Sequence, residues 1–393
     1  MAYDEPVLIA GGGIAGLATA LALAKRSIPS RILEQRPQSS EAGAGIQIGP
    51  NGVRVLMALG VAPHLASHAS RPSEIVVRQG TTARALARMP LGAWIEARHG
   101  APYWVVHRRD LQAALLACVQ AEPSIEMVTG FAVAATASHG DIIEVRSTTG
   151  EIWRGTALVG ADGIRSTIRA TVAPEARLTF SGTAASRTLL PAAAAGPLGA
   201  PDTIGVWLAP GAHVVHYPVE AGAKIAVVAI VPDDRRIDDW AAPNDWATLA
   251  PHLAAFSPTL TGVLAAAPEW RRWALFETDP LARLAAGRVA LVGDAAHPVL
   301  PFLAQGGVMA LEDALVLAHC LAGQPNDIPR ALENYEAARR ARVAAVVAAS
   351  RRNGRIFHLS GAAALARDLA LAAVPPTRLM ARYDWVYGWR PPI

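Results

Sequence analysis

Residues 7–34 read VLIAGGGIAGLATALALAKRSIPSRILE, and this stretch decides the fold. Its first 18 residues, Val7 to Ala24, carry no charge, so by length alone they fit a membrane span or a secretory signal. Export is not expected, because the residues before this run include Asp4 and Glu5 and no basic side chain. Four glycines between positions 11 and 16 also break a continuous helix and mark a tight turn.

With those glycines taken as a turn, the stretch predicts a buried strand at Pro6–Ala10, a helix from Ile14 to about Arg26 and a second strand at Ile32–Glu34. This order of strand, GxGxxG turn, helix, strand and acid is typical of a dinucleotide-binding unit. The helix N-terminus presents free N–H groups and a partial positive charge to phosphates. The alternative is a glycine-rich loop in a buried helix hairpin, and the motif alone does not distinguish NAD from FAD.

Four residues of this unit have an expected role in nucleotide binding. Gly11 permits the tight turn, Gly13 lets the backbone approach a pyrophosphate, and Gly16 lets the helix pack closely on the strand. Glu34 lies about 20 residues further on, where a carboxylate accepts hydrogen bonds from a ribose 2′-hydroxyl.

The composition of the whole chain excludes several classes of protein. The 393 residues suffice for two or three domains, and 52% apolar with 17% charged residues excludes a disordered polymer. The net charge is 36 − 32 = +4 without a basic block, so no nucleic-acid partner is expected. Cys118 and Cys320 belong to no CxxC or Cys/His cluster, which argues against a disulfide framework or a metal site and favours the cytoplasm.

Alternating strand and helix patterns predict an α/β fold whose domains are discontinuous in sequence. Residues 1–175 are expected to form a Rossmann-like domain with a small β-meander at 125–145. Residues 176–275 read as an inserted antiparallel sheet. Residues 276–393 return to the nucleotide fold and end in long helices, and a strand is also expected at Val76–Ala85.

Three motifs stand in order along the chain: GGGIAG at 11–16, GADGIRS at 160–166 and GDAAHPVLPFLAQGGVMALEDA at 293–314. Together they resemble the FAD-dependent aromatic hydroxylases, the single-component flavoprotein monooxygenases. The likeness is greatest to the branch with salicylate 1-hydroxylase and 3-hydroxybenzoate 6-hydroxylase, and it extends to GAGIQIGPNG at 43–52 and DWVYGW at 384–389. The resemblance implies that the Rossmann-like domain binds FAD and that the inserted sheet binds substrate.

The resemblance also implies a monooxygenase reaction. NADH or NADPH reduces the FAD, O2 forms a flavin C4a-hydroperoxide, and one oxygen atom enters a small aromatic such as a phenol or hydroxybenzoate. Three alternatives stay open: a flavin oxidase or dehydrogenase, an N-hydroxylase or epoxidase of another aromatic or heteroaromatic compound, and a flavin-binding regulator without turnover. The implied partners are small molecules and no membrane, and a homodimer is left open.

The family motifs place seven more residues at the FAD, namely Gln47, Arg108, Asp162, Asp294, Gly306, Gly307 and Val308. Arg108 resembles a charged donor to the cofactor, its alternative being a solvated arginine at a helix start. Asp162 would act through backbone donors or Arg165, and it would also suit an N-cap. Asp294 resembles the acid at the ribityl chain. A helix beginning at Gly306 would stabilise negative charge on a reduced flavin.

The substrate side begins with the strand AHVVHYP, in which His213 and Tyr217 share a face with Val215 while His216 points the other way. The resemblance implies that His213 takes the phenol proton, which suits an imidazole because it titrates near working pH. Tyr217 would bond the substrate or relay that proton. The alternative is a half-exposed strand histidine beside a core tyrosine.

Three further residues are candidates for substrate contact. Arg187 would bind a substrate carboxylate, with a structural salt bridge as the alternative. The resembled 3-hydroxybenzoate enzymes tend to have a polar residue where Pro301 stands, and proline offers the substrate hydroxyl no hydrogen bond. Hydroxylation para to that hydroxyl is therefore not carried over. Phe302, with Leu303 and Trp207, is expected to form an apolar wall.

Overall fold

The N-terminal stretch folds as a nucleotide-binding unit. The computed structural model of the chain describes residues 5–37, 45–235 and 242–392. Strand β1 (Val7–Ala10) leads through the glycine turn into α1 (Ile14–Ala24), and β2 (Ser30–Glu34) runs parallel to β1. The predicted order of strand, turn, helix and strand is confirmed, and the alternative of a helix hairpin is wrong.

A six-stranded sheet carries this unit, in the order β18-β19-β11-β1-β2-β7. All neighbours are parallel except β18 and β19. The other strands are β7 (Ile125–Thr129), β11 (Ala157–Gly160), β18 (Ala285–Ala286) and β19 (Val289–Leu291). In a parallel sheet the carboxyl ends of β1 and β11 lie at one edge, so the glycine turn and the GADG motif meet there.

The meander expected at 125–145 is partly wrong. Its first strand, β7, pairs in parallel with β2 and forms one edge of the six-stranded sheet. The meander itself is β8 (Val133–His139), β9 (Ile142–Ser147) and β10 (Ile152–Gly155). A turn with Gly140 at φ +59° joins β8 and β9.

The second large sheet has eight strands in the order β16-β17-β12-β15-β14-β13-β4-β5. Its strands are β4 (Glu74–Gln79), β5 (Ala85–Pro90), β12 (Thr179–Pro191), β13 (Thr203–Ala209), β14 (Ala212–Val219), β15 (Lys224–Pro232), β16 (Ala242–Asn244) and β17 (Trp270–Glu277). Neighbours are antiparallel except β13 and β4. The strand expected at Val76–Ala85 is two strands joined by a turn, and both come from sequence before residue 175.

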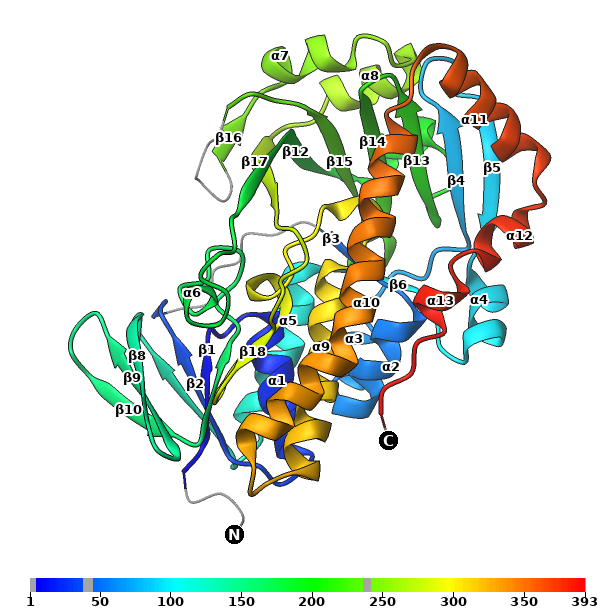
Figure 1. Cartoon of the computed structure of the whole chain (residues 1–393). Coiled ribbons are helices and arrows are strands. Elements are labelled where there is room, and N and C mark those ends of the chain that lie inside the picture. Colours follow the sequence, from blue (N-terminus) through cyan, green and yellow to red (C-terminus); the bar gives the residue numbers. More distant parts are fainter. Residues whose placement is uncertain (1–4, 38–44, 236–241, 393) are drawn as a thin grey trace.

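Helices and one short sheet connect the two large sheets. The short sheet pairs β3 (Gly45–Ile48) with β6 (Trp104–His107). The helices are α2 (Pro50–Leu59), α3 (Ala62–Leu65), α4 (Gly92–His99), α5 (Arg108–Gln120), α6 (Arg169–Val172), α7 (Trp246–Leu249), α8 (Pro258–Ala265), α9 (Gly306–Gly323), α10 (Ile328–Phe357), α11 (Gly361–Ala373), α12 (Pro376–Ala381) and α13 (Asp384–Tyr387). Figure 1 shows α10 running beside both halves of the molecule, so its residues reach the half with the six-stranded sheet and the half with the eight-stranded sheet.

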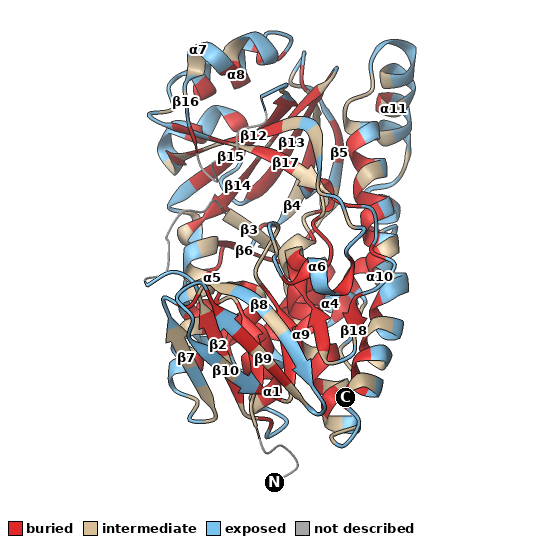
Figure 2. Ribbon diagram, turned by 60° about the vertical axis from the view of Figure 1, so that its left-hand side comes forward, coloured by how far each residue is buried: buried red, intermediate tan, exposed pale blue. Residues whose placement is uncertain are grey.

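Helix α9 is long and apolar enough to cross a membrane by composition alone. It instead packs between α1, α2 and α10, and Figure 2 shows it buried at the centre of the lower half. Buried Glu312 and Asp313 on α9 form ion pairs with α10. These contacts are those of a core helix.

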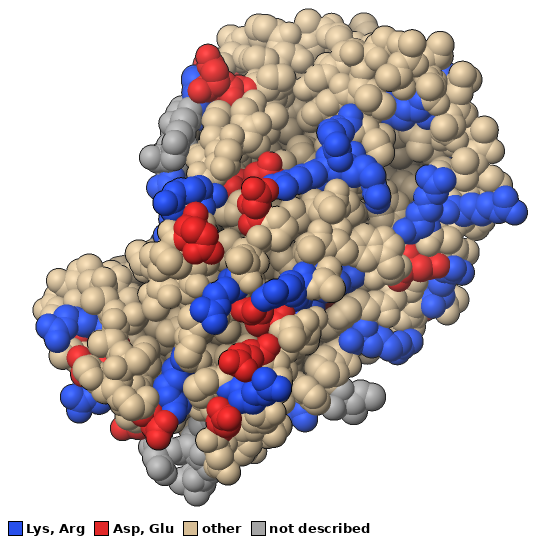
Figure 3. Space-filling view, viewed as in Figure 1, with Lys and Arg blue, Asp and Glu red and all other residues tan. Residues whose placement is uncertain are grey.

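Charged side chains on the face drawn in Figure 3 are scattered, with acidic groups interspersed among the basic ones. That distribution agrees with the small net charge of the chain.

Candidate functional site

The glycine turn forms one wall of a groove of about 590 Å³. Gly11 has φ +108°, and a Cβ there would lie 2.5 Å from the carbonyl oxygen of Ala161. A Cβ on Gly16 would lie 1.9 Å from the carbonyl oxygen of Gly11, whereas one on Gly13 would meet nothing within 4 Å. Gly11 and Gly16 are therefore required by packing, while Gly13 leaves the groove open to a ligand.

Glu34 lies on the same groove, at the end of β2. Its Oε2 accepts a hydrogen bond of 2.6 Å from the N–H of Gly12, and its Oε1 accepts one of 2.8 Å from the N–H of Arg36. The carboxylate is thus fixed beside the glycine turn by the backbone. A carboxylate at this place suits a ribose hydroxyl.

Asp162 lines the same groove and supports the loop after β11. Its Oδ2 accepts hydrogen bonds from the N–H of Thr167 at 2.7 Å and of Ile168 at 3.2 Å. The N-cap of α6 is Ile168, so the expectation of Asp162 as the N-cap is wrong. The carboxylate instead holds the backbone of the loop that leads into α6.

Arg169 follows this loop and was missed by the sequence reasoning. Its Nε donates to the carbonyl of Ala295 at 2.8 Å and its Nη2 to that of Asp294 at 2.8 Å. The buried guanidinium therefore joins the GADG loop to the GDAA loop. An arginine after a turn reads as a surface residue, so the sequence holds no local signal for this clamp.

A second cavity, of about 330 Å³, continues from the groove, and both are lined by Gly13, Arg108 and Gly163. Ten predicted site residues line it: Gly13, Gln47, Arg108, Arg187, His213, Tyr217, Asp294, Pro301, Gly306 and Gly307. The structure thus brings the predicted cofactor and substrate residues to one place. The side chain of Val308 does not line the cavity. It is buried against Gly52, where a Cβ would lie 3.0 Å from it.

The start of α9 forms one wall of this second cavity. The first N–H in the helix ladder is that of Met309, bonded to the carbonyl of Gln305 at 2.8 Å. The N–H groups of Gly306, Gly307 and Val308 precede that ladder and are the donors of a helix N-terminus. A Cβ on Gly307 would lie 2.6 Å from the side chain of Ile46, so only glycine fits at this position without a shift of Ile46.

The groove and the second cavity together fit FAD. The groove offers a carboxylate for the ribose and a helix N-terminus for the pyrophosphate, and the cavity offers a second helix N-terminus with Asp294. Arg108, which lines both spaces, adds a positive charge between them. Bound FAD would supply the redox chemistry and the activated oxygen.

His213 is buried, with 1% of its surface exposed, and lies between two phenylalanines. Its ring centroid is 5.4 Å from that of Phe302 and 5.2 Å from that of Phe357. Its Nδ1 lies 2.8 Å from Nε2 of His358. Burial and then the neighbouring His358 hold the pKa of His213 well below its ordinary value of 6.5. The expectation of a half-exposed histidine is therefore wrong.

The alternation expected along β14 is confirmed. His213, Val215 and Tyr217 line the second cavity, and His216 faces Trp207 on the other side of the sheet. The hydroxyl of Tyr217 donates to the carbonyl of Gly45 at 3.0 Å, and burial raises its pKa. Tyr217 therefore joins the eight-stranded sheet to β3.

A third cavity, of about 860 Å³, opens from the second one. Both are lined by Gln47, His213, Pro301 and Ala304. Phe302 and Leu303 line this third cavity, and their contact with substrate stays a prediction. Trp207 was wrongly predicted there, because alternation along β13 places it in the core on the opposite face of the sheet.

Arg187 is a half-buried cation in the second cavity. Its guanidinium carbon lies 3.4 Å from the ring centroid of Trp273. Within the described part of the chain no carboxylate pairs with Arg187, and its Nε has no hydrogen-bond partner. Burial lowers the pKa of Arg187 to about 9, an effect that Tyr217 opposes. The alternative of a structural salt bridge finds no partner among these residues.

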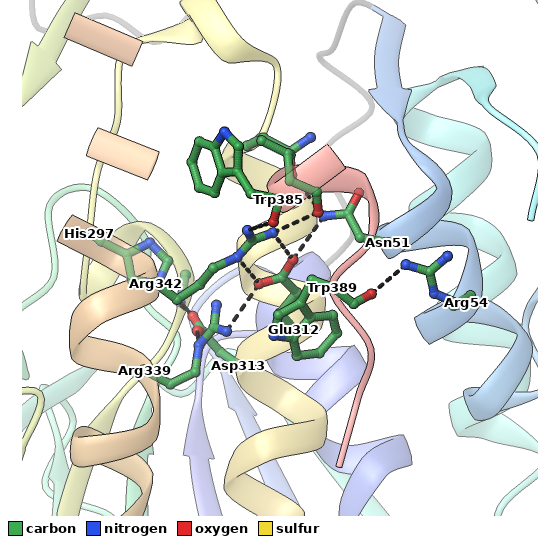
Figure 4. A network of polar contacts seen from close by, with 12 residues as sticks. Asn51, Arg54, His297, Glu312, Asp313, Arg339, Arg342, Trp385 and Trp389 are labelled. Carbon is green, nitrogen blue, oxygen red and sulfur yellow. Dashed lines mark hydrogen bonds and ion pairs between the residues drawn. The ribbon is translucent and has the colours of Figure 1, made fainter. Parts of the chain in front are cut away.

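A buried polar network behind the site was also missed, and Figure 4 shows it. Asp313 accepts from the N–H of Gly293 at 2.9 Å, lies 2.6 Å from Nε2 of His297, and pairs with Arg339 at 2.7 Å. Glu312 pairs with Arg339 at 3.0 Å. The network therefore fixes the loop that carries Asp294 against α9 and α10.

The same network holds the C-terminal segment. Arg342, which pairs with Glu312 at 2.8 Å, donates to the carbonyls of Trp385 at 2.8 Å and Val386 at 3.0 Å. Arg54 of α2 donates to the carbonyls of Tyr387 and Trp389 (Figure 4). The DWVYGW motif thus packs against the helices beside the site through its backbone.

His216 gives the protein a predicted sensitivity to acid. Burial lowers its pKa from 6.5 to about 3, with Arg78 adding to the effect. The unfolded chain therefore binds a proton below pH 6.5 that the folded protein does not, so the free energy of unfolding falls as the pH drops. The free energy of unfolding, measured with urea, should differ between pH 7.5 and pH 5 by about 2 kcal/mol less in His216→Gln than in the wild type. An unchanged difference would contradict this assignment.

Comparison with known proteins decides the family. A family model described as an FAD binding domain matches residues 4–350. The chain belongs to this FAD-binding family. It is 34% identical to 3-hydroxybenzoate 6-hydroxylase from Polaromonas naphthalenivorans (strain CJ2), over 98% of this chain and 96% of that protein. It is 35% identical to 3-amino-4-hydroxybenzoate 2-monooxygenase from Streptomyces cremeus, over 98% and 95% of the two chains.

A solved structure agrees with these relatives. Klebsiella pneumoniae HpxO, complexed with FAD and uric acid, superposes with a TM-score of 0.86 at 26% identity, over 96% of this chain and 95% of that chain. The resemblance to the FAD-dependent aromatic hydroxylases is therefore confirmed, and so are the α/β fold class and FAD as the cofactor. The protein is an oxidoreductase, an FAD-dependent monooxygenase that uses NAD(P)H and O2 to hydroxylate an aromatic substrate.

Proposed function

We propose that the substrate is a phenolic aromatic acid whose carboxylate binds Arg187 and whose hydroxyl faces His213. The observation that carries this is one cavity of about 330 Å³ lined by a half-buried arginine and a buried histidine. A cation that is partly withdrawn from water and has no carboxylate partner is costly, and a substrate anion would offset that cost. The relatives named as acting on 3-hydroxybenzoate and 3-amino-4-hydroxybenzoate support an aromatic acid.

In this proposal each side chain has one task. Neutral His213 accepts the phenol proton, because a phenolate ring is more nucleophilic toward activated oxygen than a phenol. Arg187 and Arg108 stabilise the resulting anion. Tyr217, fixed on the carbonyl of Gly45, and Phe302 shape the wall. Pro301 presents no hydrogen-bonding side chain to the substrate hydroxyl, so nothing at this position favours hydroxylation para to that hydroxyl.

The cofactor roles of the predicted residues belong to the same proposal. Gly11, Gly13 and Gly16 with Glu34 would hold the ADP half of FAD, supported by the lining of the groove. The residues proposed at the flavin half are Gln47, Arg108, Asp294 and the backbone of Gly306, Gly307 and Val308, with Asp162 as the support of the loop after β11. NAD(P)H would bind transiently.

We also propose a cytoplasmic homodimer. The use of NAD(P)H and the free thiols of Cys118 and Cys320 support the cytoplasm. Leu365 and Leu369 of α11, which are 58% and 61% exposed, support an apolar contact between subunits.

Arg187→Met tests the proposed substrate class. For the best hydroxybenzoate of a panel, kcat/KM should fall roughly 10- to 100-fold, because a charge-assisted hydrogen bond is lost. For the matching phenol without a carboxylate, kcat/KM should stay within about threefold of the wild-type value. The measurement is the rate of formation of the identified hydroxylated product. The amount of product per NAD(P)H oxidised also separates a monooxygenase from an oxidase.

The matched control is Arg271→Met, since Arg271 is the exposed residue paired with Arg187 across β12 and β17. It should leave both substrates unaffected. An equal loss for the acid and the neutral phenol, or a panel in which no aromatic acid is hydroxylated, would refute the proposed substrate class.

A further inference from the structure

Two histidines from distant parts of the chain meet at the substrate cavity. His213 lies on β14, and His358 follows the last residue of α10 as its C-cap. Their ring centroids are 5.0 Å apart, and Nδ1 of His213 lies 2.8 Å from Nε2 of His358. The carbonyl of His358 accepts from the N–H of Gly211 at 3.2 Å, which fixes the end of α10 against the β13–β14 turn.

The two rings differ in their access to water. His213 is buried among phenylalanine rings, whereas His358 is only half-buried, at the point where α10 turns into α11. Because Nδ1 of His213 is engaged with His358, Nε2 is the nitrogen left for a substrate. The pair therefore connects the cavity with the surface of the protein.

We propose that His358 is the second carrier of the phenol proton and positions His213 to receive it. The O–H bond of the substrate breaks as an N–H bond forms at Nε2 of His213. The N–H bond at Nδ1 of His213 breaks as one forms at Nε2 of His358. His358 then releases its Nδ1 proton to water, so the positive charge never stays on His213.

The surroundings of the pair support this order. Burial holds the pKa of His213 well below 6.5, so an imidazolium there would be unstable and its proton must be passed on. On the sheet, Tyr217 and Arg187 are titratable neighbours that face the same cavity. On α11, Arg367 donates to the carbonyls of Ile356 and Phe357 and pairs with Asp368 at 2.8 Å, so its charge is neutralised.

The test compares His358→Gln with wild-type holoenzyme across pH. Glutamine can keep a hydrogen bond to His213 but cannot take up a proton and pass it on. We expect kcat to fall roughly 10- to 100-fold near pH 7, with FAD content and KM unchanged. The deficit should shrink toward pH 10, where a phenol ionises without a base. In His358→Ala, added imidazoles should restore turnover in proportion to their basicity, which a purely structural role would not produce.

The inference rests on the proposed role of His213, and two arms separate their failures. The control is His252→Gln, since His252 is exposed. If kcat falls in His213→Gln while His358→Gln has the kcat of the control, the role of His358 is overturned and the role of His213 as base stands. If His213→Gln turns over like wild type, both are overturned. A third arm needs no substrate: ¹⁵N-histidine NMR of the holoenzyme should show His213 protonated at Nδ1 and bare at Nε2. The opposite tautomer between pH 6 and 9 would overturn the relay.

Discussion

His213→Gln should slow hydroxylation roughly 100- to 10,000-fold at pH 7 and leave FAD bound, because it removes the proposed general base from a site without a replacement. The phenylalanine rings around His213 exclude bulk water, so solvent would not take over the proton efficiently. FAD should stay bound because His213 lines only the proposed flavin end of the site and not the groove that would hold the ADP half. The measurement is product formed per second, with FAD content taken from the flavin absorbance.

His216→Gln is the matched control for this variant. His216 lies on the same strand and is equally buried, but it faces the opposite side of the sheet. It should turn over hydroxybenzoates at close to the wild-type rate. The deficit of His213→Gln should also shrink at high pH, as the phenol ionises by itself. A His213→Gln enzyme that hydroxylates at more than about a tenth of the wild-type rate would remove His213 from the chemistry.

Local pattern was sufficient for the fold of the nucleotide-binding unit. The glycines at 11 and 16 have a steric reason, because a Cβ at either position would meet backbone, whereas a Cβ at Gly13 would meet nothing within 4 Å. Alternation along β14 correctly put His213 and Tyr217 on one face. The same rule applied to β13 would have excluded Trp207, since Ile204, Val206 and Leu208 are the residues that face the third cavity.

Contacts between distant segments account for the rest. β4 and β5 join the eight-stranded sheet through the parallel pairing of β4 with β13, which nothing in their own sequence specifies. His358 reads as the end of a charged helix, and only the fold brings it 2.8 Å from His213. Arg169 likewise acts 125 residues away, on the carbonyl of Asp294. Periodicity predicts the face a residue occupies but not its partner from another element.

Arg339→Met should destabilise the protein by about 3–5 kcal/mol, because it leaves the buried carboxylates of Asp313 and Glu312 facing a space without their shared cation. Arg339 is 1% exposed, so water cannot replace the guanidinium. Burial raises the pKa of Asp313, but His297 and Arg339 together hold it below its ordinary value, so this carboxylate is ionised in the fold. Urea unfolding of the holoenzyme gives the difference in the free energy of unfolding.

The same substitution at Arg330, also on α10, is the control for this prediction. Arg330 pairs with Glu333 at the surface, where both side chains are more than half exposed, so Arg330→Met should cost no more than about 1 kcal/mol. Because Asp313 also accepts from Gly293, beside Asp294, the Arg339 variant should in addition release FAD more readily during gel filtration. Adding Asp313→Asn should recover part of the lost stability, since one uncompensated charge is removed. An Arg339→Met protein as stable as the Arg330 control would mean that Arg342, Asn51 and His297 hold both carboxylates without it.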